Sequence, residues 1–187
     1  MPRQKKAETA IAMLREDHRG VKALFKRFEA EDSKSAKRQI AADALMQLKL
    51  HATIEEELFY PALRQRMEDP DGLLDEADEE HHVAKILIAE LEQMKGDEDH
   101  WEAKFKVLAE SIRHHIKEEE GEMFPNAKET DIDFGVLGQQ MLDRKSSLME
   151  NGIPADAESR MIASAGLRGE SPSRKAQQSI NVPMKAA

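Results

Sequence analysis

Residues 51–61 read HATIEEELFYP, and residues 115–125 read HIKEEEGEMFP. Both stretches follow the pattern His-x-x-x-Glu-Glu-x-x-x-aromatic-Pro, with the histidine, two glutamates and the proline at identical positions. Residues four apart lie on one face of an α-helix, so each histidine shares a face with the first glutamate of its pair. The repeat indicates an internal duplication that places a His/Glu pair on each of two separate helices.

The composition favours an all-α, soluble protein. Of the 187 residues, 40% are hydrophobic and 35% are charged, and good helix formers such as Ala, Leu, Met, Glu and Lys dominate. The absence of cysteine excludes disulfides, thiolate metal sites and cysteine catalysis. The net charge of −9 argues against nucleic acid as a partner, because a phosphate backbone requires a basic surface. No apolar run is long enough to span a bilayer or form a signal-peptide core, so we expect no membrane association and a cytoplasmic location.

Apolar residues at helical spacing predict four long amphipathic helices, over roughly 8–30, 35–67, 72–95 and 98–128. Short connections make successive helices antiparallel, which gives an up-down-up-down four-helix bundle. Pro61 and Pro125 fall late in the second and fourth helices, and each is expected to bend or end its helix. We assign residues 1–130 to the bundle and 131–150 to a short accessory helix. Residues 151–187 are rich in Gly, Ser, Pro, Ala and Arg and are predicted to form a disordered tail.

Each predicted helix interrupts its apolar stripe with a histidine on the face that points into the bundle. His18 lies between Leu14 and Val21 on the first stripe, for example. In the second and fourth helices a glutamate follows the histidine one turn later on the same face. The inward polar residues are His18, His51, Glu55, His81, His115 and Glu119.

The duplication decides which of two adjacent histidines faces inward. Aligning His18 with His81 matches apolar residues with apolar residues, whereas aligning it with His82 places an apolar residue on a glutamate. The same reasoning puts His115 on the inward face rather than His114. The histidines expected to face solvent are His82, His100 and His114.

A set of buried carboxylates and imidazoles indicates a metal site. Buried carboxylates must be protonated, paired with cations or bound to metal, because an unpaired buried ion is costly. A single buried histidine is usually a hydrogen-bonded core residue, but six such side chains repeated by duplication are not explained in this way. Nitrogen and oxygen ligands without sulfur suit iron, manganese or zinc, whereas calcium and magnesium prefer oxygen alone.

The six side chains divide over two metal ions. Each ion would take two imidazoles, with Glu55 and Glu119 as bridges, and open positions would remain for solvent, an oxo or hydroxo bridge, or a small ligand such as oxygen. The other dinuclear pattern of helical bundles, Glu-x-x-His on two helices, occurs once, as Glu79 and His82 on an outward face. A ferritin-like site is therefore excluded.

The ordered set of single histidines and His-x-x-x-Glu pairs resembles the hemerythrin-like family, also called the HHE cation-binding domain, over roughly residues 8–128. The resemblance implies an antiparallel four-helix bundle with a non-haem di-iron centre, in which the histidines are terminal ligands and the two glutamates bridge. Members of the family bind oxygen, sense oxygen or iron, or act on nitric oxide or peroxide.

The chain departs from the oxygen-carrying hemerythrins in two places. Those proteins have His-x-x-x-His on the third helix, but four residues after His81 this chain has Lys85. They have His-x-x-x-x-Asp on the fourth helix, where this chain has His-x-x-x-Glu. The resemblance therefore implies one missing imidazole, with Glu80 or Glu56 as candidates to replace it. Redox chemistry with a small oxidant is then favoured over reversible oxygen carriage.

Three residues close to the expected ligands admit two roles each. Tyr60, the only tyrosine, lies one turn past Glu55 and could hydrogen-bond a ligand, but its counterpart Phe124 has no hydroxyl, which favours packing. Glu56 and Glu120 each follow a bridging glutamate by one position. We expect them on the flank of the bundle, with the orientation of an imidazole as the alternative.

The sequence-based hypothesis is a non-haem di-iron protein that binds oxygen or a related small molecule, such as peroxide or nitric oxide. The cofactor is two iron ions joined by an oxo or hydroxo bridge. The alternative is an iron-binding sensor or storage protein whose fold responds to metal occupancy. No classical catalytic motif is present, although redox activity on peroxide or nitric oxide is compatible with the site. The sequence does not indicate protein partners.

Overall fold

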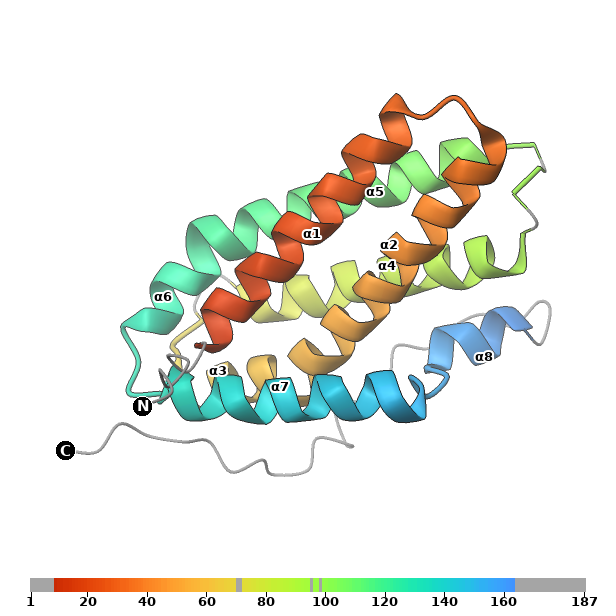
Figure 1. The fold of residues 1–187 in the computed structure, drawn as a ribbon. Coiled ribbons are helices and arrows are strands. Elements are labelled where there is room, and N and C mark those ends of the chain that lie inside the picture. The colour runs from red at the N-terminus through yellow and green to blue at the C-terminus, as the bar shows by residue number, and fades with distance from the viewer. Residues whose placement is uncertain (1–8, 70–71, 95, 98, 164–187) are drawn as a thin grey trace, which may run out of the picture.

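The computed structural model describes residues 9–69, 72–94, 96–97 and 99–163. These residues form four long antiparallel helical rods and two further helices, without a β-strand (Figure 1). The first rod is α1 (Ala10–Ala30), and the third is α4 (Leu73–Gln93). The second rod comprises α2 (Lys34–Ile54), the π-helical turn η1 (Glu55–Phe59) and α3 (Tyr60–Arg66). The fourth comprises α5 (Trp101–Glu118), the π-helical turn η2 (Glu119–Met123) and α6 (Phe124–Lys128). The predicted four-helix bundle is confirmed.

Polar side chains mark where the rods begin. The Thr9 hydroxyl accepts a hydrogen bond from the Ala12 N–H at 3.3 Å at the start of α1. At the start of α4, the two carboxylate oxygens of Asp69 accept the N–H groups of Leu73 and Leu74, each at 2.9 Å. Gly72 precedes α4 with a φ of +74°, a backbone conformation that glycine adopts without strain. Short capped connections of this kind keep neighbouring rods antiparallel.

The two prolines widen their rods instead of ending them. Each follows a π-helical turn, in which the Tyr60 N–H donates to the Glu55 carbonyl and the Phe124 N–H donates to the Glu119 carbonyl. Proline has no N–H, and its ring would clash with the carbonyl four residues earlier in a regular α-helix. A wider turn accommodates both features. Each π turn begins at one of the two glutamates that were predicted to bridge metal ions.

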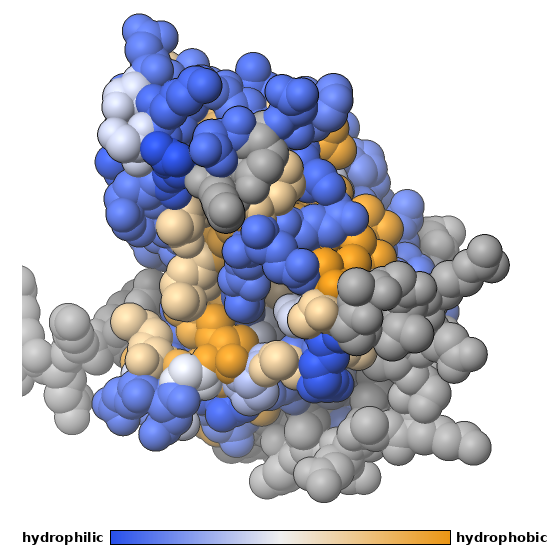
Figure 2. Space-filling view, turned by 90° about the vertical axis from the view of Figure 1, so that its right-hand side faces the viewer, coloured by the Kyte–Doolittle hydropathy of each residue, from blue (hydrophilic) through white to orange (hydrophobic). Residues whose placement is uncertain are grey.

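The apolar core consists of two clusters, one toward each end of the bundle. One cluster includes Leu14, Phe59 and Phe124, and the other includes Val21 and Phe105. The buried polar residues of the rods lie between the two clusters, as His18 does between Leu14 and Val21 on α1. Apolar packing on both sides therefore separates this polar layer from water. In Figure 2 the surface is mostly hydrophilic, and apolar residues gather toward the middle of the face shown.

Two helices follow the bundle. The predicted accessory helix is confirmed as α7 (Phe134–Asn151), which crosses the bundle against α1 and α2. The prediction of a disordered tail from residue 151 is wrong for residues 151–163, because α8 (Ala157–Ala163) packs along α4. The Asp156 carboxylate caps α8 by accepting the Ser159 N–H at 2.7 Å. A helix of seven residues is too short to show a period in the sequence and depends on packing for its stability.

Residues 164–187, the remainder of the predicted tail, lie outside the described residues. No helix in the described part of the chain is both long enough and apolar enough to cross a membrane.

Candidate metal centre

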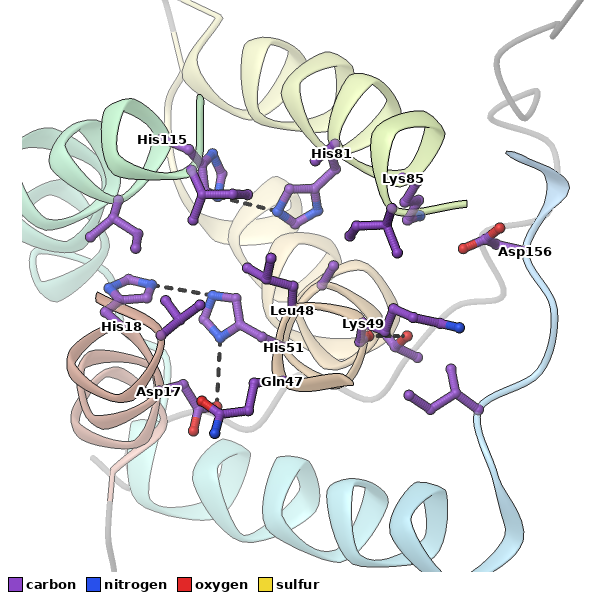
Figure 3. Close-up of a pocket in the computed structure, with 18 residues that line it drawn as sticks. Asp17, His18, Gln47, Leu48, Lys49, His51, His81, Lys85, His115 and Asp156 are labelled. Carbon is purple, nitrogen blue, oxygen red and sulfur yellow. Dashed lines mark hydrogen bonds and ion pairs between the residues drawn. The ribbon is translucent and has the colours of Figure 1, made fainter. Parts of the chain in front are cut away.

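The six residues predicted to bind metal meet in the middle of the bundle, each rod contributing at least one. All are buried, and the most exposed of them, His51, keeps only 8% of its accessible surface. Figure 3 shows the four imidazoles pointing toward one another from the four rods. The predicted inward face of each helix, and the choice of His81 and His115 over their neighbours, therefore agree with the structure.

The six side chains form two clusters. In the first, His18 Nε2 lies 3.2 Å from His51 Nε2 and 3.1 Å from Glu119 Oε2. His51 Nε2 lies 3.1 Å from Glu55 Oε2 in the same cluster. One ligand atom from each of these four residues lies within 4.8 Å of all the others, which is a spacing that one metal ion could span.

The second cluster shares both glutamates with the first. His81 Nε2 and His115 Nε2 lie 3.1 Å apart. Glu55 Oε2 is 3.5 Å from His81 Nε2, and Glu119 Oε2 is 3.5 Å from His115 Nε2. Each carboxylate therefore contacts one histidine of each cluster, so that both glutamates lie between the two pairs of histidines.

The donor set fits a metal better than it fits hydrogen bonding within the protein. Both oxygens of Glu55 and Oε2 of Glu119 are buried and accept no hydrogen bond of regular geometry. The nearest polar groups to the two Oε2 atoms are imidazole nitrogens, at 3.1 Å. Buried carboxylate oxygens without such partners carry a large desolvation cost. A bound cation would compensate this cost, so the residues present fit a metal centre.

Each imidazole also contacts a carboxylate through its other ring nitrogen, Nδ1. The four pairs are His18–Glu120 at 2.8 Å, His81–Glu56 at 3.0 Å, His115–Glu80 at 2.7 Å and His51–Asp17 at 3.5 Å. The first three are hydrogen bonds, and the longer fourth is an ion pair. A carboxylate at Nδ1 fixes the proton on that atom and leaves Nε2 free to bind a metal.

These contacts correct two expectations. Glu56 and Glu120 follow the alternative expectation instead of the favoured one, since each orients the single histidine of the other half. Glu56 and Glu80 do not replace the missing imidazole, because each contacts the outer nitrogen of a histidine. The roles of these glutamates depend on which neighbouring rod each one meets, and the sequence does not show this.

The duplication also accounts for Lys85. It lies four residues after His81, as Lys22 lies four residues after His18. Lys85 donates a hydrogen bond to Glu56, and Lys22 Nζ lies 3.4 Å from Glu120 Oε1. Lys85 is therefore one of two equivalent lysines, each of which contacts a carboxylate that orients a histidine. The alignment of His18 with His81 already places Lys22 on Lys85, so the sequence contains the signal for this pair.

Tyr60 breaks the symmetry of the two clusters. Its hydroxyl donates to Glu119 Oε1 at 3.0 Å and lies 3.4 Å from Nε2 of both His81 and His115. Its ring also packs on the His81 ring at 5.4 Å, much as Phe124 stacks on His18 at 5.8 Å. The expectation of packing alone is therefore incomplete, because Tyr60 packs and also hydrogen-bonds within the second cluster.

The charges of the centre are strongly coupled. Burial lowers the pKa of His51, but nearby carboxylates, Glu55 foremost, outweigh it and raise that pKa to about 10. Burial also lowers the pKa of His115, but nearby carboxylates, Glu119 foremost, outweigh it and raise that pKa to about 9. The pKa of Glu119 is lowered although burial raises it, because His115 and other imidazoles surround it. Without metal, protons on His51 and His115 therefore take the place of a cation.

A small cavity reaches the imidazoles from the side of the apolar cluster that contains Val21 (Figure 3). All four histidines line it, as do Lys49, Lys85, Ile153 and Asp156. Figure 3 shows Lys49, Lys85 and Asp156 on the side away from the meeting point of the imidazoles, and Ile153 belongs to the same short connection as Asp156. The volume of the cavity is about 30 Å³. A water molecule needs roughly 10–15 Å³ of such space. The cavity therefore has room for a few water-sized groups, which favours a small ligand.

His82 departs from the prediction that it faces solvent. Its Nδ1 lies 2.6 Å from Glu158 Oε1, and Glu158 on α8 is itself buried. The prediction was wrong because it did not include α8, which covers this part of α4. His100 and His114 are exposed, as predicted.

Comparisons with known proteins agree with this arrangement. Residues 9–127, more than half of the chain, match the family described as the hemerythrin HHE cation-binding domain. A crystal structure of a hemerythrin HHE cation-binding domain-containing protein from Mycobacterium kansasii is similar, with a TM-score of 0.65 and 24% sequence identity. The similarity covers 76% of this chain and 88% of that one, and at this identity it supports the fold alone. A comparison with curated proteins found no match. The chain belongs to the hemerythrin HHE cation-binding domain family.

Proposed function

We propose that this protein holds two iron ions in its bundle and binds oxygen or a related small molecule, such as peroxide or nitric oxide, at them. The observation that supports this proposal most strongly is the pair of His/Glu clusters that share Glu55 and Glu119. Two clusters with common carboxylates are the expected geometry for two bridged ions. The proposed ligands are His18, His51, Glu55, His81, His115 and Glu119.

The choice of iron follows from the donor set. Imidazole nitrogens and carboxylate oxygens without sulfur suit a first-row transition metal, and the resemblance to hemerythrins favours iron over manganese and zinc. When bound, iron supplies redox chemistry and open coordination positions for a small ligand. Two imidazoles and shared carboxylates for each ion leave such positions open.

The protein's own residues bind, orient and protect the centre. The imidazoles face the centre through Nε2. Glu56, Glu80 and Glu120 accept hydrogen bonds from Nδ1 of three of them, and Asp17 forms an ion pair with Nδ1 of His51. Tyr60 holds one oxygen of Glu119 and leaves Oε2 available. The two apolar clusters exclude bulk water, and the small cavity favours a small ligand.

A second candidate function is an iron-responsive or iron-storing protein. The unpartnered oxygens of Glu55 and Glu119 favour it, because metal binding would relieve a destabilising charge arrangement in the centre of the fold. Occupancy of the site would then change the stability of the whole bundle. A large difference in stability without reactivity toward oxygen or peroxide would favour this candidate.

The proposal is tested by loading the purified protein with iron, measuring metal per chain and recording its optical spectrum before and after reduction and exposure to oxygen. We expect about two irons per chain, as the two clusters require, and an oxo-bridge charge-transfer band that bleaches on reduction. Zinc as the preferred metal, or less than one metal per chain without such a band, would contradict the proposal. Expected controls are loss of metal in His81→Ala and His115→Ala, and retention in His114→Ala.

A further inference from the structure

Part of the outer wall of the cavity is built by a segment of the chain that lies beyond the family match. That match ends at residue 127, whereas Ile153 and Asp156 come from the connection between α7 and α8. The inner end of the cavity consists of bundle residues, including all four histidines. Residues of the family match and residues of the C-terminal segment therefore line different parts of the same cavity, which we treat as the path from solvent to the imidazoles.

Two polar contacts hold this segment against the bundle. At one end, Lys145 on α7 donates to both oxygens of Asp17, at 2.5 and 2.6 Å, and Asp17 is the acid beside His51. At the other end, Glu158 on α8 pairs with His82 on α4 at 2.6 Å. The connection that carries Ile153 thus has an attachment on each side.

The backbone and packing direct Ile153 toward the cavity. Gly152 ends α7 with a φ of +86°, a left-handed conformation that lets the chain turn sharply. Ile153 follows at once, lines the cavity and packs on the apolar cluster that contains Leu14. Figure 3 shows the segment carrying Asp156 beside the outer end of the cavity, across from Lys49 and Lys85.

We propose that Ile153 is a specificity-determining residue that limits the size of molecule able to reach the metal centre. This inference rests on the proposed function, since it concerns a ligand that binds the metal. A branched, stiff side chain held at the outer wall narrows a path whose volume is only about 30 Å³. Small ligands pass it, and a ring-shaped ligand is excluded.

The test uses the full chain loaded with oxidised iron, with azide as the small probe and free imidazole as the ring-shaped probe. Association is followed by stopped-flow absorbance. In Ile153→Ala we expect azide to associate about tenfold faster, the low end of the range seen among variants of one site, and imidazole binding to become measurable. In Ile153→Trp azide should associate more slowly than in the wild type. The matched control is Met149→Ala, an apolar residue of α7 that is 69% exposed and away from the cavity.

Measuring the metal content distinguishes a failure of the proposed function from a failure of the proposed role of Ile153. A wild-type protein that binds no iron would overturn the proposed function. The role of Ile153 would be overturned if iron-loaded Ile153→Ala and Ile153→Trp bound azide at the same rates as Met149→Ala. The proposed metal site would be unaffected by that result. If Ile153→Ala does not fold, two milder variants replace it. Ile153→Val shortens the same side chain, and Glu158→Ala removes the contact with His82 that holds this segment on α4. Both are expected to speed azide association, and unchanged rates in both would also overturn the role.

Discussion

Lys85 acts on the centre through a chain of hydrogen bonds. It contacts Glu56, which accepts from Nδ1 of His81. Burial raises the pKa of Glu56, but His81 and Lys85 outweigh it and lower that pKa to about 2. Glu56 therefore stays ionised and holds the His81 proton on Nδ1, so that Nε2 faces the second cluster.

Replacing Lys85 by methionine should weaken metal binding at the second cluster. Loss of a group that orients a metal-binding histidine typically costs roughly 10–100-fold in affinity, and we expect the low end because Lys85 acts through Glu56. A competition titration against a chelator measures the effect. Lys49→Met is the matched control, since Lys49 has a similar exposure, 21% against 14%, but pairs with Glu92 on the outer surface. Equal affinities in the two variants would rule out this role for Lys85.

Replacing Tyr60 by phenylalanine removes one hydroxyl and retains the ring. Glu119 Oε1 would lose its donor in a buried site. A buried acceptor left without a partner costs about 1–3 kcal/mol, so the free energy of unfolding of the metal-free protein should fall by that amount in urea titrations. Thr53→Val removes a half-buried hydroxyl that donates to the Lys49 carbonyl outside the centre and should cost less. Equal losses in both variants would mean that the Tyr60 hydroxyl has no special role.

At the level of single residues, the sequence predicts the inward set and gives the support of an imidazole by Glu56 or Glu120 only as an alternative. His18, His51 and Glu55 could be predicted because they interrupt apolar stripes that follow the helical period. Glu56 and Glu120 lie one position further on, about 100° around the helix axis. Only the packing of neighbouring rods shows that a side chain pointing in this direction contacts an imidazole of the next rod. A hydrogen bond from the Tyr60 hydroxyl was only the less favoured alternative, because its counterpart Phe124 suggested that the ring alone mattered.

The rods are held together away from the centre by aromatic packing. Phe28 on α1 and Phe105 on α5 have ring centroids 4.2 Å apart, and Trp101 packs beside them. These residues belong to the cluster at the end of the bundle that contains Val21. The cluster can stabilise the bundle whether or not metal is bound.

Phe105→Ala should therefore destabilise the metal-free and metal-loaded proteins alike. The expected loss is about 3–5 kcal/mol, which is typical of a buried phenylalanine truncated to alanine, and metal per chain should stay at the wild-type value. Urea unfolding with and without metal, together with metal analysis, checks this prediction. A loss of metal in Phe105→Ala would show that this end of the core is not independent of the centre.

At the level of helices, the bounds of the four rods and of α7 follow from periodicity and turns. The π turns could not be located from the prolines alone, since a proline is compatible with a bend, an end or a widened turn. The helix α8 was missed because its seven residues gain their order from contact with α4. Long periodic elements were thus predictable, and short ones stabilised by tertiary contacts were not.

The whole molecule should respond to pH through its metal-free centre. The pKa of His51 is raised to about 10 and that of His115 to about 9, from an ordinary value of 6.5. A histidine whose pKa is raised on folding stabilises the folded state fully below its unfolded pKa, and this contribution is lost as pH rises through the folded pKa. The metal-free protein should therefore lose stability between about pH 7 and 10.

Metal binding must displace the same protons, so metal affinity should rise over the same interval of pH. Thermal melts and chelator competition at neutral and alkaline pH, with and without iron, measure both trends. The metal-loaded protein should melt higher than the metal-free protein at each pH, and the gap should widen as pH rises. A metal-free protein that becomes more stable toward alkaline pH would contradict the protonation of His51 and His115.

The claim that six residues hold two metal ions is tested most directly by anomalous X-ray diffraction at the iron edge, on crystals of the iron-loaded protein. We expect two anomalous peaks. One should lie among His18, His51, Glu55 and Glu119, and the other should lie beside His81 and His115, with the two carboxylates between them. A single peak, or a peak only at the more exposed group of Glu80, His114 and Glu118, would contradict it.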